Sequence, residues 1–140
     1  MKIGFTGTKD GMTDAQKLKF DLFITSLSPT EFHHGSCVGA DDEAGIIVKK
    51  NKPNCQIVLH PPIKTTLKAD SYFDVSREPK DYLVRNKDIV NESDVLIATP
   101  KEHNEQLRSG TWSTIRYAQK INKPLICIFP DGTYKCEGFK

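Results

Sequence analysis

The chain has 140 residues, of which 37% are hydrophobic and 27% are charged, a composition typical of soluble globular proteins. This length predicts a single domain over residues 1–140, large enough to bury a core without metal or disulfide staples. The net charge of +2 is too small to indicate a nucleic-acid or membrane-surface protein, although it does not exclude a local basic patch. No run reaches the ~20 apolar residues of a membrane span.

Cysteine and histidine usage points to a cytoplasmic protein without a metal site or a cofactor. The opening residues have too short an apolar stretch for a signal peptide. The cysteines lack a CxxC pair, and we expect reduced thiols. They are Cys37, Cys55, Cys127 and Cys136. The histidines are too dispersed along the chain to propose a metal, and they are His33, His34, His60 and His103.

Five short apolar runs predict strands. They cover residues 2–5, 31–34, 56–60, 94–98 and 125–129. The last three are nearly continuous in apolar character, which is typical of strands that are buried on both faces of a parallel sheet.

Helical patterns fill the gaps between these runs. They cover residues 13–27, 40–50, 81–92 and 110–121, and Thr13 with Gln16 has the spacing of a capping box. Alternating strands and helices predict an α/β three-layer sandwich with a mainly parallel five-stranded sheet, in the order 3-2-1-4-5. Residues 61–80 fit no periodic template, and residues 131–140 either form a short hairpin or fray.

The strand ends carry the candidate ligand-binding residues, because ligands of open parallel sheets bind beyond the carboxyl ends of the strands, where the strand order reverses. Glycine, hydroxyl groups and a positive charge follow the first strand, as Thr6, Gly7, Thr8 and Lys9. The stretch is either a plain strand-to-helix loop or a ligand contact.

A glycine-rich loop follows the second strand. Its members are Gly35, Ser36, Cys37, Gly39, Ala40 and Asp41. Bare backbone N–H groups at a helix start predict an anion site, although the loop is neither a P-loop nor GxGxxG. Asp41 either caps the helix or holds a ribose hydroxyl.

A third loop follows the fourth strand and ends in Arg108, Ser109, Gly110 and Thr111. Arginine beside a helix N-terminus suits phosphate, although Ser109 alone also explains a helix cap. Arg85 and Asn86, on the helix before that strand, are either ligand contacts or a surface pair. Because the three loops converge in the predicted sheet, we expect them to bind a phosphate-bearing small molecule, and we interpret it as a nucleotide.

Several of these segments together resemble the SLOG superfamily, the Rossmann-like group that includes DNA-processing protein A and the LOG phosphoribohydrolases. The segments are GFTGT at 4–8, HGSCVGADDEA at 34–44, VRNKDIVNESDVLIATP at 84–100, SGTWSTIRYA at 109–118 and KPLICIFP at 123–130. The small single-domain YspA/YpsA-like branch is the most similar. The resemblance implies a nucleotide-derived ligand, a homodimer, and phosphate binding by Gly35, Ser36, Gly39, Ala40, Asp41, Ser109, Gly110 and Thr111.

The chain departs from the LOG enzymes at one functional position. Those enzymes have PGGxGTxxE, whose glutamate takes part in cleaving the N-glycosidic bond, whereas this chain has Thr114 there. We therefore expect a sensor or accessory binding protein. The alternative is a nucleoside-monophosphate hydrolase or transferase that uses Asp41, or else Glu102. Single-stranded DNA binding through Lys49, Lys50 and Lys52 is possible but not favoured.

Overall fold

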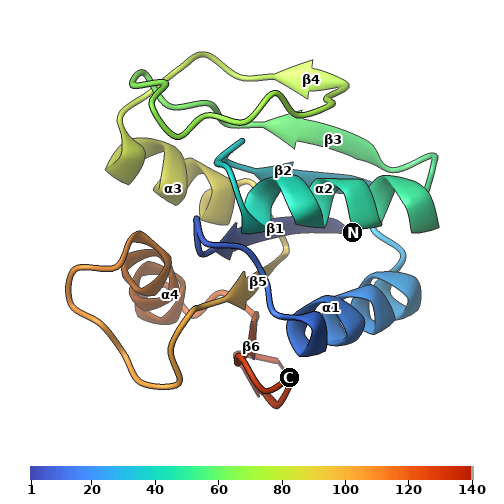
Figure 1. Cartoon of the computed structure of the whole chain (residues 1–140), viewed down its shortest axis with the longest axis vertical. Helices are drawn as coiled ribbons and strands as arrows, with labels where there is room; N and C mark the ends of the chain where they lie inside the picture. The colour runs from blue at the N-terminus through green and yellow to red at the C-terminus, as the bar shows by residue number, and fades with distance from the viewer. Residues whose placement is uncertain (140) are drawn as a thin grey trace.

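The computed structural model describes residues 1–139 and contains one seven-stranded sheet in the order β4-β3-β2-β1-β5-β6-β7. Figure 1 shows β1 in the middle of this sheet, with β4 towards one edge and β6 towards the other. All neighbouring strands are parallel except β6 and β7. The strands are β1 Lys2–Gly7, β2 Glu31–His34, β3 Gln56–Leu59, β4 Val75–Ser76, β5 Val95–Thr99, β6 Leu125–Ile128 and β7 Tyr134–Glu137.

Four helices complete an α/β three-layer sandwich. They are α1 Asp14–Leu27, α2 Ala40–Asn51, α3 Tyr82–Asn91 and α4 Gly110–Lys120. One core cluster joins α1 and α2 to the sheet, and a second joins α3 and α4 to it. The predicted order 3-2-1-4-5 is confirmed, because the five predicted strands are β3, β2, β1, β5 and β6 in that spatial order.

Two strands are additional to the prediction. The backbone N–H of Ile57 donates to the Asp74 carboxylate at 2.8 Å, and β4 then pairs with β3 through only two residues. The tail forms β7, which pairs antiparallel with β6, so the hairpin alternative for this segment is confirmed as far as residue 139. Neither strand is a buried apolar run, so the pattern that revealed the other five does not mark them.

Local sequence explains how the elements begin and pack. Thr13 and Gln16 form the predicted capping box at the start of α1. The rings of Phe5, Phe20 and Phe32 lie 5.3–5.9 Å apart between their centroids and hold α1 against β1 and β2. No helix within residues 1–139 is long and apolar enough to cross a membrane.

Candidate functional site

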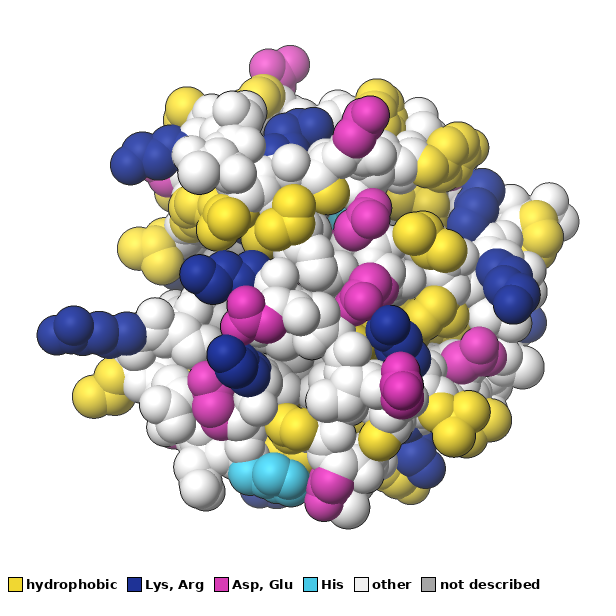
Figure 2. Space-filling model, in the orientation of Figure 1, with side chains coloured by type: hydrophobic (Ala, Val, Ile, Leu, Met, Phe, Trp, Pro, Cys, Tyr) yellow, Lys and Arg dark blue, Asp and Glu magenta, His cyan; other side chains and the backbone are white. Residues whose placement is uncertain are grey.

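A crevice of about 450 Å³ opens at the carboxyl ends of β1 and β5, where the strand order reverses. Figure 2 shows the molecule hollowed at its left edge, with Lys and Arg side chains around the hollow. Most of the predicted site residues line this crevice. They are Thr6, Gly7, Thr8, Lys9, Cys37, Asp41, Arg85, Asn86, Arg108, Ser109, Gly110 and Thr111.

Four predicted residues of the loop before α2 do not line the crevice. Gly35 lies against Arg85, and its carbonyl accepts a hydrogen bond from Arg85 Nη1 at 2.6 Å. Ser36 is fully buried, and its hydroxyl donates to the Ala69 carbonyl. Gly39 has a φ of +89°, and a Cβ there would overlap the backbone of the β1–α1 loop. Ala40 is fully buried.

Four N–H groups of this loop donate hydrogen bonds within the protein, so the expectation of bare donors for an anion is wrong at those four positions. Ser36 donates to His34 Nδ1, and Cys37 donates to Asp41 Oδ2. Val38 donates to the Leu67 carbonyl, and Ala40 donates to the Thr8 carbonyl. Two of these acceptors lie about thirty residues away along the chain, so the local sequence does not reveal them.

Asp41 lies in the crevice wall and is 6% exposed. Burial raises its pKa to about 6, although Arg85 and the backbone N–H groups of Cys37 and Gly35 oppose the rise. The carboxylate accepts the Cys37 N–H at 3.2 Å, so it closes the loop that precedes it. Asp41 therefore has a structural role that neither sequence interpretation included.

Arg85 is only 5% exposed, so it is a buried positive charge and not one member of an exposed Arg–Asn pair on the surface. Its Nη1 donates to the carbonyls of Gly35 and His60, and its Nε donates to Asn86 Oδ1 at 2.6 Å. The guanidinium also lies 4.8 Å from the centre of the Tyr82 ring, and both side chains line the crevice. Three protein acceptors fix the position of this charge.

The start of α4 was interpreted in two ways, as a helix cap and as an anion site. Ser109 is the cap, because its hydroxyl accepts the Trp112 N–H at 3.1 Å. Gly110 has no such internal explanation: its φ is not positive, and a Cβ there would meet nothing within 4 Å. By contrast, a Cβ at Gly7 would overlap Ala40 and Thr99.

Two positive side chains of the crevice are unpaired. Lys101 makes an ion pair with Asp10 at 2.8 Å, and Glu102 accepts a hydrogen bond from Trp112 Nε1 at 3.0 Å. Lys9 and Arg108 are exposed and form no ion pair or hydrogen bond through their side chains with the residues described. The available charge in the crevice is therefore positive.

Thr114, which stands in place of the LOG glutamate, does not replace it. The side chain is 2% exposed, and its hydroxyl donates to the Gly110 carbonyl at 2.9 Å within α4. It does not line the crevice.

The predicted set omitted several residues that line the crevice. They are Phe5, Asp10, Leu67, Tyr82, Ile89 and Lys101. Glu102, the second candidate for a catalytic carboxylate, also lines the crevice. Leu67 comes from the stretch 61–80, which no periodic pattern describes. Tyr82 stands one helical turn before Arg85, so the spacing i, i+3 was a usable signal for it.

The structure brings together two histidines that the sequence separates by 27 positions. His33 Nδ1 and His60 Nε2 lie 2.8 Å apart, so the interpretation of the histidines as dispersed is wrong for this pair. His34 points elsewhere, and its Nε2 lies near Gly45 of α2.

Comparisons with known proteins support the fold. No family model matches the chain, and no curated protein is similar to it in sequence. Among solved structures, the molybdenum cofactor binding protein of the phototrophic bacterium Rippkaea orientalis is 24% identical, with a TM-score of 0.69 over 91% of this chain and 76% of that chain. The molybdenum cofactor carrier protein of Chlamydomonas reinhardtii is 20% identical, with a TM-score of 0.62 over 90% of this chain and 74% of that chain.

These likenesses confirm, at the level of the fold, what the resemblance to the SLOG superfamily implied. The YspA/YpsA-like branch and the homodimer stay predictions. The chain has the same Rossmann-like fold as the two molybdenum cofactor proteins to which it is similar.

Proposed function

We propose that this protein binds the phosphate of a nucleotide or nucleotide-derived small molecule in the crevice, and that it acts as a sensor or accessory binding protein. The observation that carries the proposal is Gly110, a glycine at the start of a helix with neither a conformational nor a packing reason to lack a side chain. A bare backbone there leaves room for a ligand to approach the helix N-terminus.

The electrostatics of α4 favour an anion. The first N–H groups of a helix have no acceptor within it, and the aligned peptide dipoles place partial positive charge there. The N–H groups of Gly110 and Thr111 have no acceptor among residues 1–139. The unpaired Lys9 and Arg108 line the same crevice. Arginine matches the geometry of phosphate oxygens through two parallel N–H donors.

The size and walls of the crevice suit the rest of such a molecule. A volume of about 450 Å³ lies within the range of small-molecule sites. The Tyr82 ring lines the same crevice and supplies aromatic surface for a planar base. Because the two solved structures described above are molybdenum cofactor proteins, we include that cofactor, as cargo, among the ligands to test.

One observation favours a second candidate function, cleavage of a nucleotide N-glycosidic bond. Asp41 lines the crevice, and its raised pKa of about 6 places its titration near neutral pH, as acid–base catalysis requires. Release of free base from a nucleoside monophosphate, abolished in Asp41→Asn with ligand binding retained, would support it. The absence of base release across a nucleotide panel would count against it.

Native mass spectrometry tests the binding proposal. The freshly purified protein is measured first, and any molecule released on denaturation is identified. The same protein is then mixed with nucleoside mono-, di- and triphosphates, ADP-ribose and the molybdenum cofactor. We expect one phosphate-bearing molecule per chain that survives dilution. If neither a co-purified molecule nor any member of the panel binds at millimolar concentration, the proposal is wrong.

A further inference from the structure

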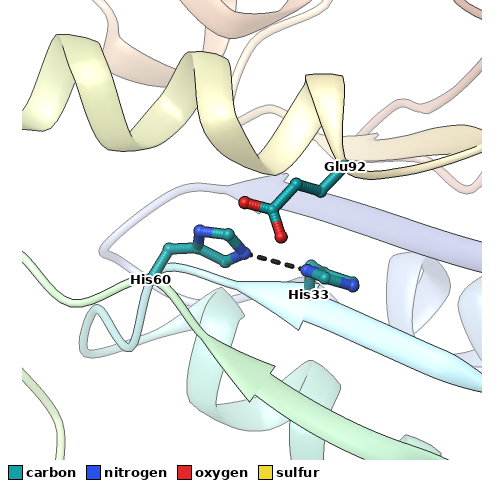
Figure 3. A group of neighbouring side chains, drawn as sticks. All are labelled: His33, His60 and Glu92. Atoms are coloured by element: carbon teal, nitrogen blue, oxygen red, sulfur yellow. Dashed lines mark hydrogen bonds between the residues drawn. The ribbon is translucent and has the colours of Figure 1, made fainter. Parts of the chain in front are cut away.

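Two imidazoles and a carboxylate meet beneath the C-terminal end of α3, outside the residues that line the crevice. His33 lies on β2, His60 directly follows β3, and Glu92 is the C-cap of α3. One potential ligand atom from each lies within 4.8 Å of the other two. Figure 3 shows the Glu92 carboxylate directed towards the pair of imidazole rings. The two histidines are 0% and 2% exposed, so solvent does not separate them.

The hydrogen bonds fix which nitrogen of His33 is free. Its Nε2 lies 2.9 Å from Glu31 Oε1, and an ionised carboxylate only accepts hydrogen bonds. The proton of the neutral ring therefore sits on Nε2, and Nδ1 presents a lone pair towards His60 Nε2. This arrangement is the one that metal-bound histidines adopt: one ring nitrogen donates to a carboxylate and the other faces the metal.

The contact between the two rings also fixes the proton on His60. Because His33 Nδ1 carries no proton, His60 Nε2 donates to it across the 2.8 Å contact. A metal that replaces this hydrogen bond therefore needs the proton of His60 to move to its other ring nitrogen.

The Glu92 carboxylate is also held in place by a hydrogen-bonding partner. Arg77 donates from both Nε and Nη2 to Glu92 Oε1, at 3.1 and 2.8 Å. The other oxygen, Oε2, has no partner among the residues that the structure describes. The Glu92 side chain is 36% exposed, which gives an ion a route from solvent to the buried imidazoles.

We propose that His33 Nδ1, His60 Nε2 and the Glu92 carboxylate bind one Zn²⁺ ion, with water as the fourth ligand. Two imidazoles and a carboxylate form a donor set that zinc accepts. Zinc–nitrogen bonds of about 2.0–2.1 Å place tetrahedral ligand nitrogens about 3.3 Å apart, so the pair must open by about half an ångström. His60 changes to the tautomer protonated at Nδ1, without net proton release. The ion then links the end of α3 to β2 and β3.

Metal titration of the full chain tests this proposal. After treatment with EDTA, the protein is titrated with Zn²⁺ by calorimetry and with Co²⁺ by absorption spectroscopy. We expect one ion per chain and the weak visible bands of tetrahedral cobalt, without the intense near-ultraviolet band of thiolate ligation. A thiolate band would assign the metal to cysteines and overturn the proposal, as would failure of the wild-type protein to bind either ion.

Three variants make the assignment specific. His60→Gln and Glu92→Gln should each weaken zinc binding by at least about a hundredfold, and Glu31→Gln by about tenfold. Glu92 is partly exposed, so its variant should fold even if the buried His60 variant does not. His103→Gln is the matched control, because it removes an exposed histidine remote from the cluster and should bind zinc as the wild type does. Unchanged affinity in a folded Glu92→Gln protein would exclude the site.

Discussion

Two strand-to-helix loops of this molecule have the same sequence character and opposite structures. The loop before α2 and the loop before α4 both contain serine and place a glycine at or next to the first residue of a helix. The first is largely closed on the protein: the N–H groups of Ser36, Cys37, Val38 and Ala40 donate to internal acceptors, and Gly39 is required by its backbone conformation. The second is open, because nothing in the structure explains Gly110. A glycine at a helix start therefore indicates a ligand only where neither its backbone conformation nor the packing around it requires a glycine.

Substitution of Gly39 should have the largest effect. An alanine there combines a φ of +89° with overlap of the Lys9 backbone, so we expect Gly39→Ala to lower the free energy of unfolding by about 4 kcal/mol. Urea unfolding followed by circular dichroism measures it. A loss below about 1 kcal/mol would show that the closed loop is not constrained as described.

The closed loop should also make stability depend on pH through Asp41. The pKa of Asp41 in the folded protein, about 6, lies above its ordinary value of 3.8. The native state therefore keeps this proton where the unfolded chain has lost it, so the contribution of Asp41 to stability falls as pH rises from about 4 to about 6.

Comparison with Asp41→Asn isolates this effect. The free-energy difference, wild type minus variant, should fall by on the order of 2 kcal/mol across that pH range. Carboxyl groups with lowered pKa values give the opposite slope, but they are present in both proteins and cancel; they are Asp10, Asp74 and Asp131. Parallel pH profiles of the two proteins would contradict the raised pKa.

The open loop should lose ligand affinity when its unpaired charge is removed. Arg108→Ala should weaken binding of the phosphate-bearing ligand by about 2 kcal/mol, close to thirtyfold, because a charged hydrogen bond is lost. Lys101→Ala is the matched control: Lys101 lines the same crevice but is already paired with Asp10, so its loss should matter much less. Equal losses in the two variants would indicate general attraction of anions and not a specific contact. Calorimetric titration measures both.

The sequence predicts the sheet order and most of the crevice, because both depend on local patterns. Continuous apolar runs such as Ile97 and its neighbours mark buried strands, and the strand ends then converge by topology. The same reasoning cannot tell the two glycine loops apart, because the acceptors that close the first loop are remote in sequence. Pairing of His33 with His60 is equally invisible, since it depends on the register of β2 against β3.

The most direct test of the open loop compares Gly110→Ala with Ser113→Ala, a neighbouring change on the same helix outside the crevice. The dissociation constant of the identified ligand and the free energy of unfolding are measured for both and for the wild type. We expect Gly110→Ala to weaken binding by at least about tenfold, or 1.4 kcal/mol, without loss of stability, because the added methyl group meets only the ligand. Ser113→Ala should bind as the wild type does. Wild-type affinity in Gly110→Ala would contradict phosphate binding at the start of α4.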